Sequence, residues 1–293
     1  MRLSTVILPS ERWSENRPKW IEAERLGLHA AYTYDHLSWR SFRERPWFTM
    51  VPFLAAASQV TSSIRLGPLV TTPNFRHPLL LAKDLLALDD VSNGRLVVGV
   101  GAGGQGFDAS VLGHEPWSDR ERFARYQEFT LTLERLLREP ATSVKGEYYS
   151  VQDSRQLPGP VQRPRPPLYL SGLRRRSIAF AAEVGDGWVS VGAFSDAGDS
   201  TEVAVERQSQ LLDDALGELG RTGPYERLFL GPQTDEAPLG SYEGFLDWAG
   251  RYRELKITEL VIHYPIPDSI FDYDHGLFER IATEGRDVLE SWS

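Results

Sequence analysis

The sequence predicts an α/β fold, a (β/α)8 TIM barrel in which eight parallel strands alternate with helices. Short runs rich in β-branched and apolar residues alternate with longer helical patterns along the chain. Eight such units in 293 residues take about 37 residues each, which suits a barrel with loop insertions at its C-terminal face. A doubly wound open sheet is the alternative, but it usually needs fewer strands or a second domain. We therefore expect a single domain over residues 1–293.

Local patterns indicate where the individual elements begin and end. The run Leu-Val-Val-Gly-Val at 96–100 is apolar throughout, as in a strand that is buried on both faces. Ser118 and Glu121 form a capping box that begins one helix, and Ser92-Asn93-Gly94 ends another. Residues 146–167 and 232–240 are rich in loop-forming residues. The expected strands are 3–8, 30–34, 64–71, 96–100, 167–171, 187–191, 227–230 and 259–263, and the expected helices are 17–26, 49–59, 78–91, 119–137, 175–183, 201–219, 242–255 and 277–291.

The composition excludes several classes of function. Lys and Arg number 32 against 41 Asp and Glu, a net charge of −9, and no basic stretch suggests nucleic acid as a partner. The absence of cysteine excludes disulfides, thiol catalysis and cysteine-based metal sites, and no histidine pattern typical of a metal site occurs. No run approaches the roughly 20 apolar residues that cross a bilayer. We expect no membrane partner, a small-molecule substrate and a cytoplasmic location.

Polar residues follow several of the expected strands, where the active site of a parallel barrel lies. Asp35 and His36 follow the second strand, and histidine is the usual group for proton transfer near neutral pH. Trp39 comes three residues later and suits the wall of a site for a planar ligand or a substrate. On these residues alone, a turn in which Asp35 caps the next segment while His36 and Trp39 pack is the simpler interpretation.

Two further strand ends carry residues that suit an anionic ligand. The glycine-rich run at 101–106 allows backbone amides to approach a phosphate or the edge of a flavin, although a tight barrel turn explains it equally well. It lacks the Gly-Lys-Ser/Thr ending of a Walker loop. Arg174, Arg175 and Arg176 lie at the start of a helix, where an anion would offset their repulsion by the helix dipole. A solvated basic face is the alternative. His263 ends the eighth strand.

At this point the chain resembles the bacterial luciferase-like flavin and deazaflavin oxidoreductases. The segments that carry the resemblance are GPLVTTPNFRHP at 67–78, LDDVSNGRLVVGVGAG at 88–103, PVQRP at 160–164 and DGW at 186–188. The resemblance is clear from about residue 1 to 195 and weaker beyond. It implies a (β/α)8 barrel that transfers hydride or oxygen with FMN or with the deazaflavin coenzyme F420. Because Asp35, His36 and Trp39 are similar to the deazaflavin branch, F420 is the first expectation and FMN the alternative.

The resemblance also implies roles for individual residues. His36 would be the acid/base next to the reacting ring carbon, and Asp35 would lie at the ring. Trp39 and His263 would contact the substrate. Residues expected to line the cofactor ring are Leu69 and Val70, joined by a non-prolyl cis peptide bond, with Thr72, Gly101, Ala102 and Gly103. Residues expected at the cofactor phosphate or acidic tail are Ser171, Gly172, Arg174 and Arg175.

Two positions differ from the family pattern. Leu173 follows Gly172 where a second glycine is common, which bears on the phosphate contact. Gly104 stands where some deazaflavin dehydrogenases have an acidic residue, which argues against a sugar-phosphate substrate. The resemblance further implies a homodimer and a separate flavin or F420 reductase. An FMN-dependent two-component monooxygenase and a non-catalytic flavin-binding barrel are the two alternatives to an F420-dependent oxidoreductase.

Overall fold

The computed structural model describes residues 1–104, 107–192, 199–231 and 238–292. Residues 105–106 of the expected glycine-rich turn and 232–237 of the expected loop at 232–240 lie outside this description. Ten strands are present in the part that is described, eight in one sheet and two in another. Their bounds are β1 (Arg2–Val6), β2 (Ala30–Thr33), β3 (Arg65–Pro68), β4 (Val98–Val100), β5 (Ala141–Lys145), β6 (Ser150–Arg155), β7 (Leu168–Ser171), β8 (Gly187–Ser190), β9 (Glu226–Leu230) and β10 (Glu259–His263).

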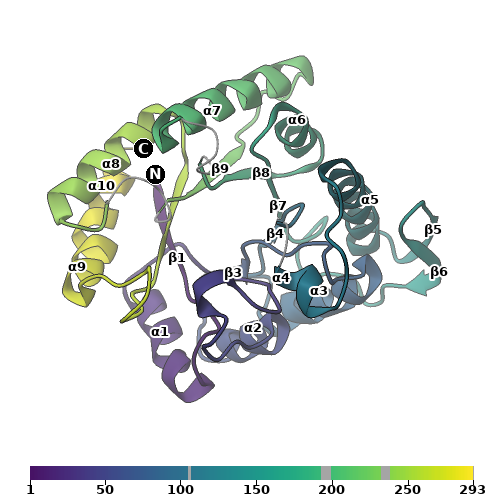
Figure 1. Cartoon of the computed structure of the whole chain (residues 1–293), viewed down its shortest axis with the longest axis horizontal. Coiled ribbons are helices and arrows are strands. Elements are labelled where there is room, and N and C mark those ends of the chain that lie inside the picture. The colour runs from purple at the N-terminus through teal and green to yellow at the C-terminus, as the bar shows by residue number, and fades with distance from the viewer. Residues whose placement is uncertain (105–106, 193–198, 232–237, 293) are drawn as a thin grey trace. The chain divides into compact units, whose positions relative to one another are not determined.

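The larger sheet consists of parallel strands in the order β3-β2-β1-β10-β9-β8-β7-β4 (Figure 1). Parallel bridges from Leu66 to Leu96 and from Thr71 to Val100 join the β3 segment to the β4 segment. Each of these eight strands overlaps one that the sequence predicts. The predicted (β/α)8 barrel fold is therefore confirmed.

Helices connect the strands, and several of them begin at a residue whose side chain accepts a hydrogen bond from an amide of the first turn. Ser118 accepts a hydrogen bond from the Glu121 amide, so the predicted start of the helix after it is confirmed. Ser200, Ser241 and Asp274 cap three later helices in the same way. The helices are α1 (Trp13–Arg25), α2 (Met50–Ser58), α3 (Pro78–Val91), α4 (Phe107–Val111), α5 (Asp119–Arg138), α6 (Arg175–Val184), α7 (Thr201–Glu218), α8 (Tyr242–Glu254), α9 (His275–Arg280) and α10 (Arg286–Ser291), with a 3-10 turn η1 (Arg40–Phe42) and a π-helical turn η3 (Ile281–Gly285).

Three elements were not expected from the sequence. The antiparallel hairpin of β5 and β6 overlaps the segment that was expected to be a loop. Most of its side chains are exposed, so it lacks the alternation of apolar and polar residues by which a half-buried strand is recognised. The others, α4 and η1, are too short for a helical period to show in the sequence.

The chain forms two compact units, which are described one at a time. Unit 1 consists of Met1–Ile7, Pro18–Tyr32 and Tyr169–Ser293, and unit 2 consists of Leu8–Arg17 and Thr33–Leu168. The organisation as a single domain over 1–293 stays a prediction.

Hydrogen bonds of the half-buried Arg95 and of the buried Asp89 connect the elements of unit 2, and both residues lie within the segments that carry the family resemblance. The guanidinium of Arg95 donates to the Ser58, Thr61, Ile64 and Ser92 carbonyls. These bonds connect the end of α2 to the start of β3 and to the end of α3. The completely buried carboxylate of Asp89 accepts from the backbone amides at 161 and 162 and from the side-chain amide at 162. These motifs therefore stabilise the fold.

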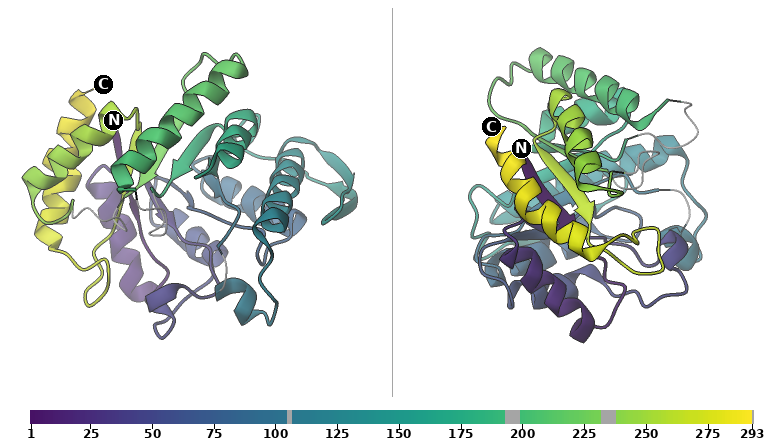
Figure 2. Two further views of the ribbon diagram at one scale, coloured as in Figure 1. Left: turned by 45° about the horizontal axis from the view of Figure 1, so that its top comes forward. Right: turned by 90° about the vertical axis from the view of Figure 1, so that its left-hand side faces the viewer.

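Unit 1 packs its C-terminal helix along β1, as Figure 2 shows in yellow and purple. The N-terminal ammonium of Met1 donates to the Leu289 carbonyl at 2.9 Å. On another face of this unit, Phe229 of β9 stacks on Tyr252 of α8, with ring centroids 4.2 Å apart. These contacts bury large apolar side chains against the strands of unit 1.

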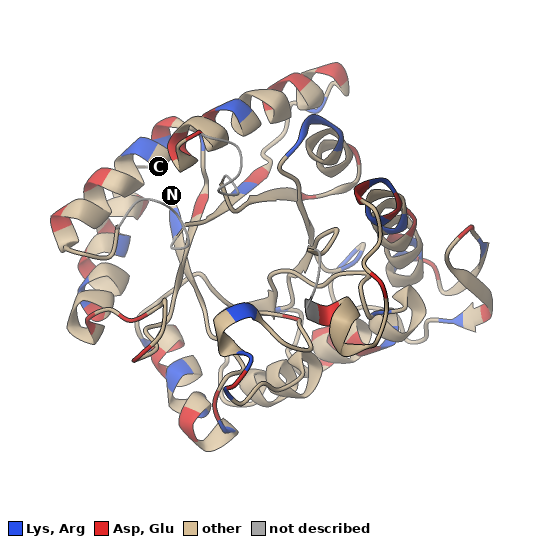
Figure 3. Ribbon diagram, in the orientation of Figure 1, with Lys and Arg blue, Asp and Glu red and all other residues tan. Residues whose placement is uncertain are grey.

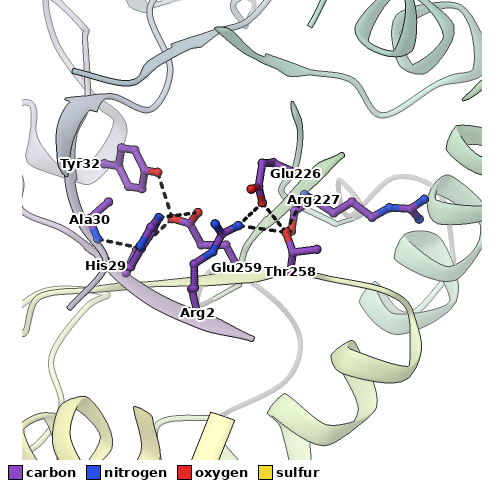
Figure 4. A network of polar contacts seen from close by, with 9 residues as sticks. Arg2, His29, Ala30, Tyr32, Glu226, Arg227, Thr258 and Glu259 are labelled. Carbon is purple, nitrogen blue, oxygen red and sulfur yellow. Dashed lines mark hydrogen bonds and ion pairs between the residues drawn. The ribbon is translucent and has the colours of Figure 1, made fainter. Parts of the chain in front are cut away.

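A network of polar contacts lies at the amino ends of the unit 1 strands (Figure 4). Arg2 pairs with Glu226, which also accepts from the Thr258 hydroxyl at 2.9 Å. Glu259 is completely buried, and one of its oxygens accepts from Ser4 at 2.6 Å and from the hydroxyl of Tyr32 at 2.9 Å. Burial raises the pKa of Glu259, although these hydrogen bonds act to lower it.

Candidate active site

Asp35 lies just after β2 in unit 2 and is the centre of a buried ion pair. Its carboxylate is 1% exposed and accepts from the Arg76 guanidinium at 2.6 and 3.0 Å. The Thr71 hydroxyl donates to the same carboxylate at 2.6 Å. Although burial acts to lower it, the hydrogen bonds to Asp35 raise the pKa of Arg76. The buried negative charge is thus compensated by a two-pronged cation and one hydroxyl.

His36 is held by a different acidic residue. Its Nδ1 lies 2.8 Å from an oxygen of Asp108, and the second oxygen of Asp108 accepts from the Leu37 amide at 2.8 Å. The indole of Trp47 donates to the His36 carbonyl at 2.8 Å. The His36 side chain is 23% exposed. Among the described residues, its Nε2 makes no hydrogen bond, so this atom is the one left for a ligand.

This geometry answers the question that the sequence left open about Asp35 and His36. Asp35 was considered as the group that orients His36, or as a cap for the next segment. The structure gives it neither contact, because its carboxylate is occupied by Arg76 and Thr71. The orienting carboxylate belongs to Asp108, which lies 72 residues beyond the histidine. Proximity in sequence thus pointed to the wrong acid as the partner of His36.

Trp39 is buried in an aromatic cluster after β2. It is 6% exposed, stacks on Trp47 with ring centroids 6.4 Å apart, and meets the edge of Tyr34 at 5.3 Å. Phe42 completes the cluster. The packing interpretation of Trp39 therefore holds, and contact with a substrate stays a prediction.

The third and fourth strand ends of the barrel lie against each other in unit 2. The peptide bond between Leu69 and Val70 is cis, as predicted. After it, Thr71 donates its amide to the Gly99 carbonyl at 2.9 Å and accepts from the Gly101 amide at 2.9 Å. Thr72 is buried, and its hydroxyl accepts a hydrogen bond from the backbone amide of Asn74. These bonds bring the expected ring-lining residues of the two strand ends together.

Glycine at 103 is required by the backbone and by its neighbour. Its φ is +74°, and a Cβ there would lie 2.5 Å from the side chain of Asn74. Gly101 is buried and Ala102 is half-buried. A tight turn therefore explains part of the glycine content, and a cofactor contact at Gly101, Ala102 and Gly103 stays a prediction.

The residues that were expected to bind the cofactor phosphate lie at the start of α6 in unit 1. A Cβ on Gly172 would lie 2.7 Å from the backbone carbon of Ser177, so strand β7 passes close to the helix start. The indole of Trp188 donates to the Gly172 carbonyl at 2.7 Å. Ser171 is half-buried, whereas Arg174 and Arg175 are exposed, and the start of the helix is blue in Figure 3. Their role at a phosphate stays a prediction.

His263 ends β10 in unit 1, as predicted, but its side chain is completely buried. It stacks on Phe271 with ring centroids 3.6 Å apart, and burial lowers its pKa to about 3. A neutral ring covered by Phe271 is a packing group, which counts against the predicted contact with substrate.

The described residues contain neither a helix suited to a membrane nor a cluster suited to a metal ion. No helix within 1–104, 107–192, 199–231 and 238–292 is both long and apolar enough to span a bilayer. In the same ranges no three His, Asp or Glu side chains gather as they would around a metal ion.

The sequence analysis assigned no role to Asp108 or Thr71, and it contained Arg76 only as part of the segment 67–78. Arg76 lies within the segment 67–78, so its position in that motif was an available signal. Asp108 offered none, since neither its spacing nor its neighbours in sequence indicate a histidine partner.

The fold and these strand-end groups define a (β/α)8-barrel enzyme. The family model for luciferase-like monooxygenases matches residues 4–210, and the chain belongs to this family. The resemblance found in the sequence motifs is thereby confirmed.

Individual relatives differ in their cofactors. The F420-dependent glucose-6-phosphate dehydrogenase of Amycolatopsis mediterranei is 30% identical over 172 residues, which cover 58% of this chain and 50% of that protein. The chain thus spans about half the length of this relative. An F420-dependent secondary alcohol dehydrogenase in complex with an F420-acetone adduct has a TM-score of 0.76 at 19% identity, over 89% of this chain and 92% of that one. The oxygenating constituent of 3,6-diketocamphane monooxygenase from Pseudomonas putida, in complex with FMN, has a TM-score of 0.63 at 17% identity, over 78% and 67%. At these identities the two structures show the fold alone.

Proposed function

We propose that this protein is a coenzyme F420-dependent oxidoreductase that transfers a hydride to or from a small organic substrate, with His36 as the acid/base. The observation that carries the proposal is the state of His36, which is partly exposed after a barrel strand with one ring nitrogen bound and the other available. The F420 dependence of the Amycolatopsis relative supports the choice of cofactor.

Taken separately, each unit carries residues that suit one part of a flat tricyclic cofactor with an anionic tail. In unit 2, the strand ends that carry the Leu69–Val70 cis bond and Gly101 are joined by two backbone hydrogen bonds of Thr71, and Leu69, Val70, Gly101 and Ala102 have no polar side chain. Thr72 adjoins them. In unit 1, the exposed side chains of Arg174 and Arg175 suit phosphate and carboxylate groups, whereas the Gly172 amide already donates to the Val189 carbonyl at 3.3 Å. When bound, F420 accepts or supplies the hydride at a ring carbon.

The chain's own groups manage the proton that accompanies this hydride. When a substrate hydroxyl is oxidised to a carbonyl, Nε2 of His36 would take the proton from its oxygen, and the hydride on its carbon is the one that a bound cofactor would accept. The reverse reaction returns that proton from His36. Arg76 and Thr71 occupy the Asp35 carboxylate, and the guanidinium compensates its charge.

The first experiment identifies the cofactor. The absorbance and mass of any compound that co-purifies are recorded, and the protein is titrated with F420 and with FMN. Binding of F420 with substrate-dependent absorbance change supports the proposal. Tight FMN binding with no response to F420 refutes it.

The second experiment tests His36. His36→Ala should lower turnover by roughly 10²–10⁴, the usual contribution of a general acid/base, because the variant lacks the proposed proton acceptor. His114→Ala is the matched control, since His114 is an exposed histidine of the same unit. Equal activities of the two variants would contradict the assignment of His36.

Two alternatives remain as outcomes of these assays. The first is a two-component FMN monooxygenase, which would consume oxygen when supplied with reduced FMN by a separate reductase. A non-catalytic flavin-binding barrel would hold cofactor and stay silent across a substrate panel. For the F420 enzyme we further propose a homodimer, a cytoplasmic location and a separate reductase that regenerates the cofactor.

A further inference from the structure

We infer that Asp108 is the positioning residue for His36, and that it fixes the neutral imidazole as the tautomer with the proton on Nδ1. Nε2 is then the atom that exchanges a proton with the substrate. The statement about the tautomer stands on the geometry of the side chains, and the statement about the substrate rests on the proposed function.

Asp108 contacts the His36 ring with one carboxylate oxygen and the backbone amide of the next residue, Leu37, with the other. It is 3% exposed; one oxygen lies 2.8 Å from Nδ1 and the other accepts the Leu37 amide at 2.8 Å. An ionised carboxylate can only accept hydrogen bonds, so the proton between it and Nδ1 belongs to the imidazole. A neutral imidazole carries one N–H, which leaves Nε2 as an acceptor.

The histidine is anchored on its backbone as well as on its ring. Asp108 binds the amide that follows His36, and Trp47 binds the His36 carbonyl at 2.8 Å. The edge of Tyr34 meets the ring at a centroid distance of 6.0 Å. The Asp108 carboxylate therefore binds both the His36 ring and the peptide bond that follows His36. The direction in which Nε2 points is thus coupled to the position of Asp108.

Among the described residues, His36 is the ion-pair partner of the Asp108 carboxylate. Asp35 has the guanidinium of Arg76, but no Lys or Arg pairs with Asp108 in the described part of the chain. When Nε2 takes a proton, the imidazolium becomes the counter-ion of Asp108. Two neighbouring acids thus have separate tasks: one is neutralised permanently, and the other stabilises the positive histidine only while it holds the proton.

The Leu37 amide makes one substitution especially informative. In Asp108→Asn, this N–H must face the oxygen of the introduced amide, which turns the NH2 group toward Nδ1. Nδ1 then becomes the acceptor and the proton moves to Nε2. We expect a reversed tautomer with an almost unchanged ring position, and a loss of kcat of about 10²- to 10⁴-fold with little change in KM. Asp108→Glu keeps the charge and should retain the original tautomer.

The tautomer is read on the full chain by ¹⁵N chemical shifts of labelled histidine, with His36→Gln to assign the signals. Glu22→Gln is the control, because Glu22 pairs with His275 at 3.1 Å in unit 1 and its loss should leave the His36 signals unchanged. Circular dichroism checks that each variant is folded.

The two readouts separate this inference from the proposed function. A wild-type His36 with its proton on Nε2, or an unchanged tautomer in folded Asp108→Asn, overturns the positioning role whatever the activity. The expected tautomers in a protein that never reacts with F420 uphold the positioning role and refute the proposed function. If Asp108→Asn does not fold, the wild-type and Asp108→Glu tautomers decide the matter.

Discussion

Removing the cation of the buried pair in unit 2 should destabilise the protein strongly. Asp35 is 1% exposed, and Arg76 supplies two of the three hydrogen bonds that its carboxylate receives. In Arg76→Leu only the Thr71 hydroxyl remains, at 2.6 Å. A buried carboxylate that loses its cation costs about 3–5 kcal/mol. Because the Arg76 side chain is 18% exposed, water can reach part of the site, and we expect about 3 kcal/mol.

The assay is equilibrium unfolding in urea, followed by circular dichroism and by tryptophan fluorescence so that coincident transitions justify a two-state free energy. Arg138→Leu is the control, since it removes an exposed pair with Glu134 and should cost only about 0.3–0.5 kcal/mol. The double variant with Asp35→Asn should recover most of the loss, because the uncompensated charge is gone. An Arg76→Leu cost no larger than that of the control would refute the argument that Asp35 needs this cation.

Two further outcomes follow from unit 1. Burial raises the pKa of Glu259 above its ordinary value of 4.5, so the folded state binds this proton more tightly and wild-type stability falls as pH rises above about 4.5. In denaturation curves, the stability of Glu259→Gln relative to wild type should therefore grow with pH and then level off. The introduced amide oxygen can still accept the hydrogen bonds from the Ser4 and Tyr32 hydroxyls. A difference in stability that stays constant across pH would contradict this prediction. Gly172→Ala places a Cβ 2.7 Å from Ser177, so we expect a loss of about 1–3 kcal/mol of stability. Gly217 lies inside α7 with open space around it, so Gly217→Ala should instead stabilise the protein by up to about 1 kcal/mol. A melting temperature of Gly172→Ala no lower than that of wild type would show that the close approach is relieved without cost.

Predictions that depended on short stretches of sequence agree best with the structure. Strand β10 and helix α3 have the bounds that were expected, because their apolar patterns and flanking breakers lie within a few residues of each other. The cis bond between Leu69 and Val70 was predicted from the segment 67–78, which is likewise a short stretch of sequence. The hairpin of β5 and β6 was missed because exposed strands carry no alternation to recognise.

The sequence by itself determined the alternation of strands and helices, hence the barrel, and placed Asp35 and His36 at the end of a strand. Only the tertiary structure decided how these two side chains are used. Arg76 is 41 residues from Asp35 and Asp108 is 72 residues from His36, so each pair exists only because separate strand ends meet in unit 2. Periodicity and capping are interactions between near neighbours in the chain, whereas the partner of a buried charge is selected by packing among distant segments.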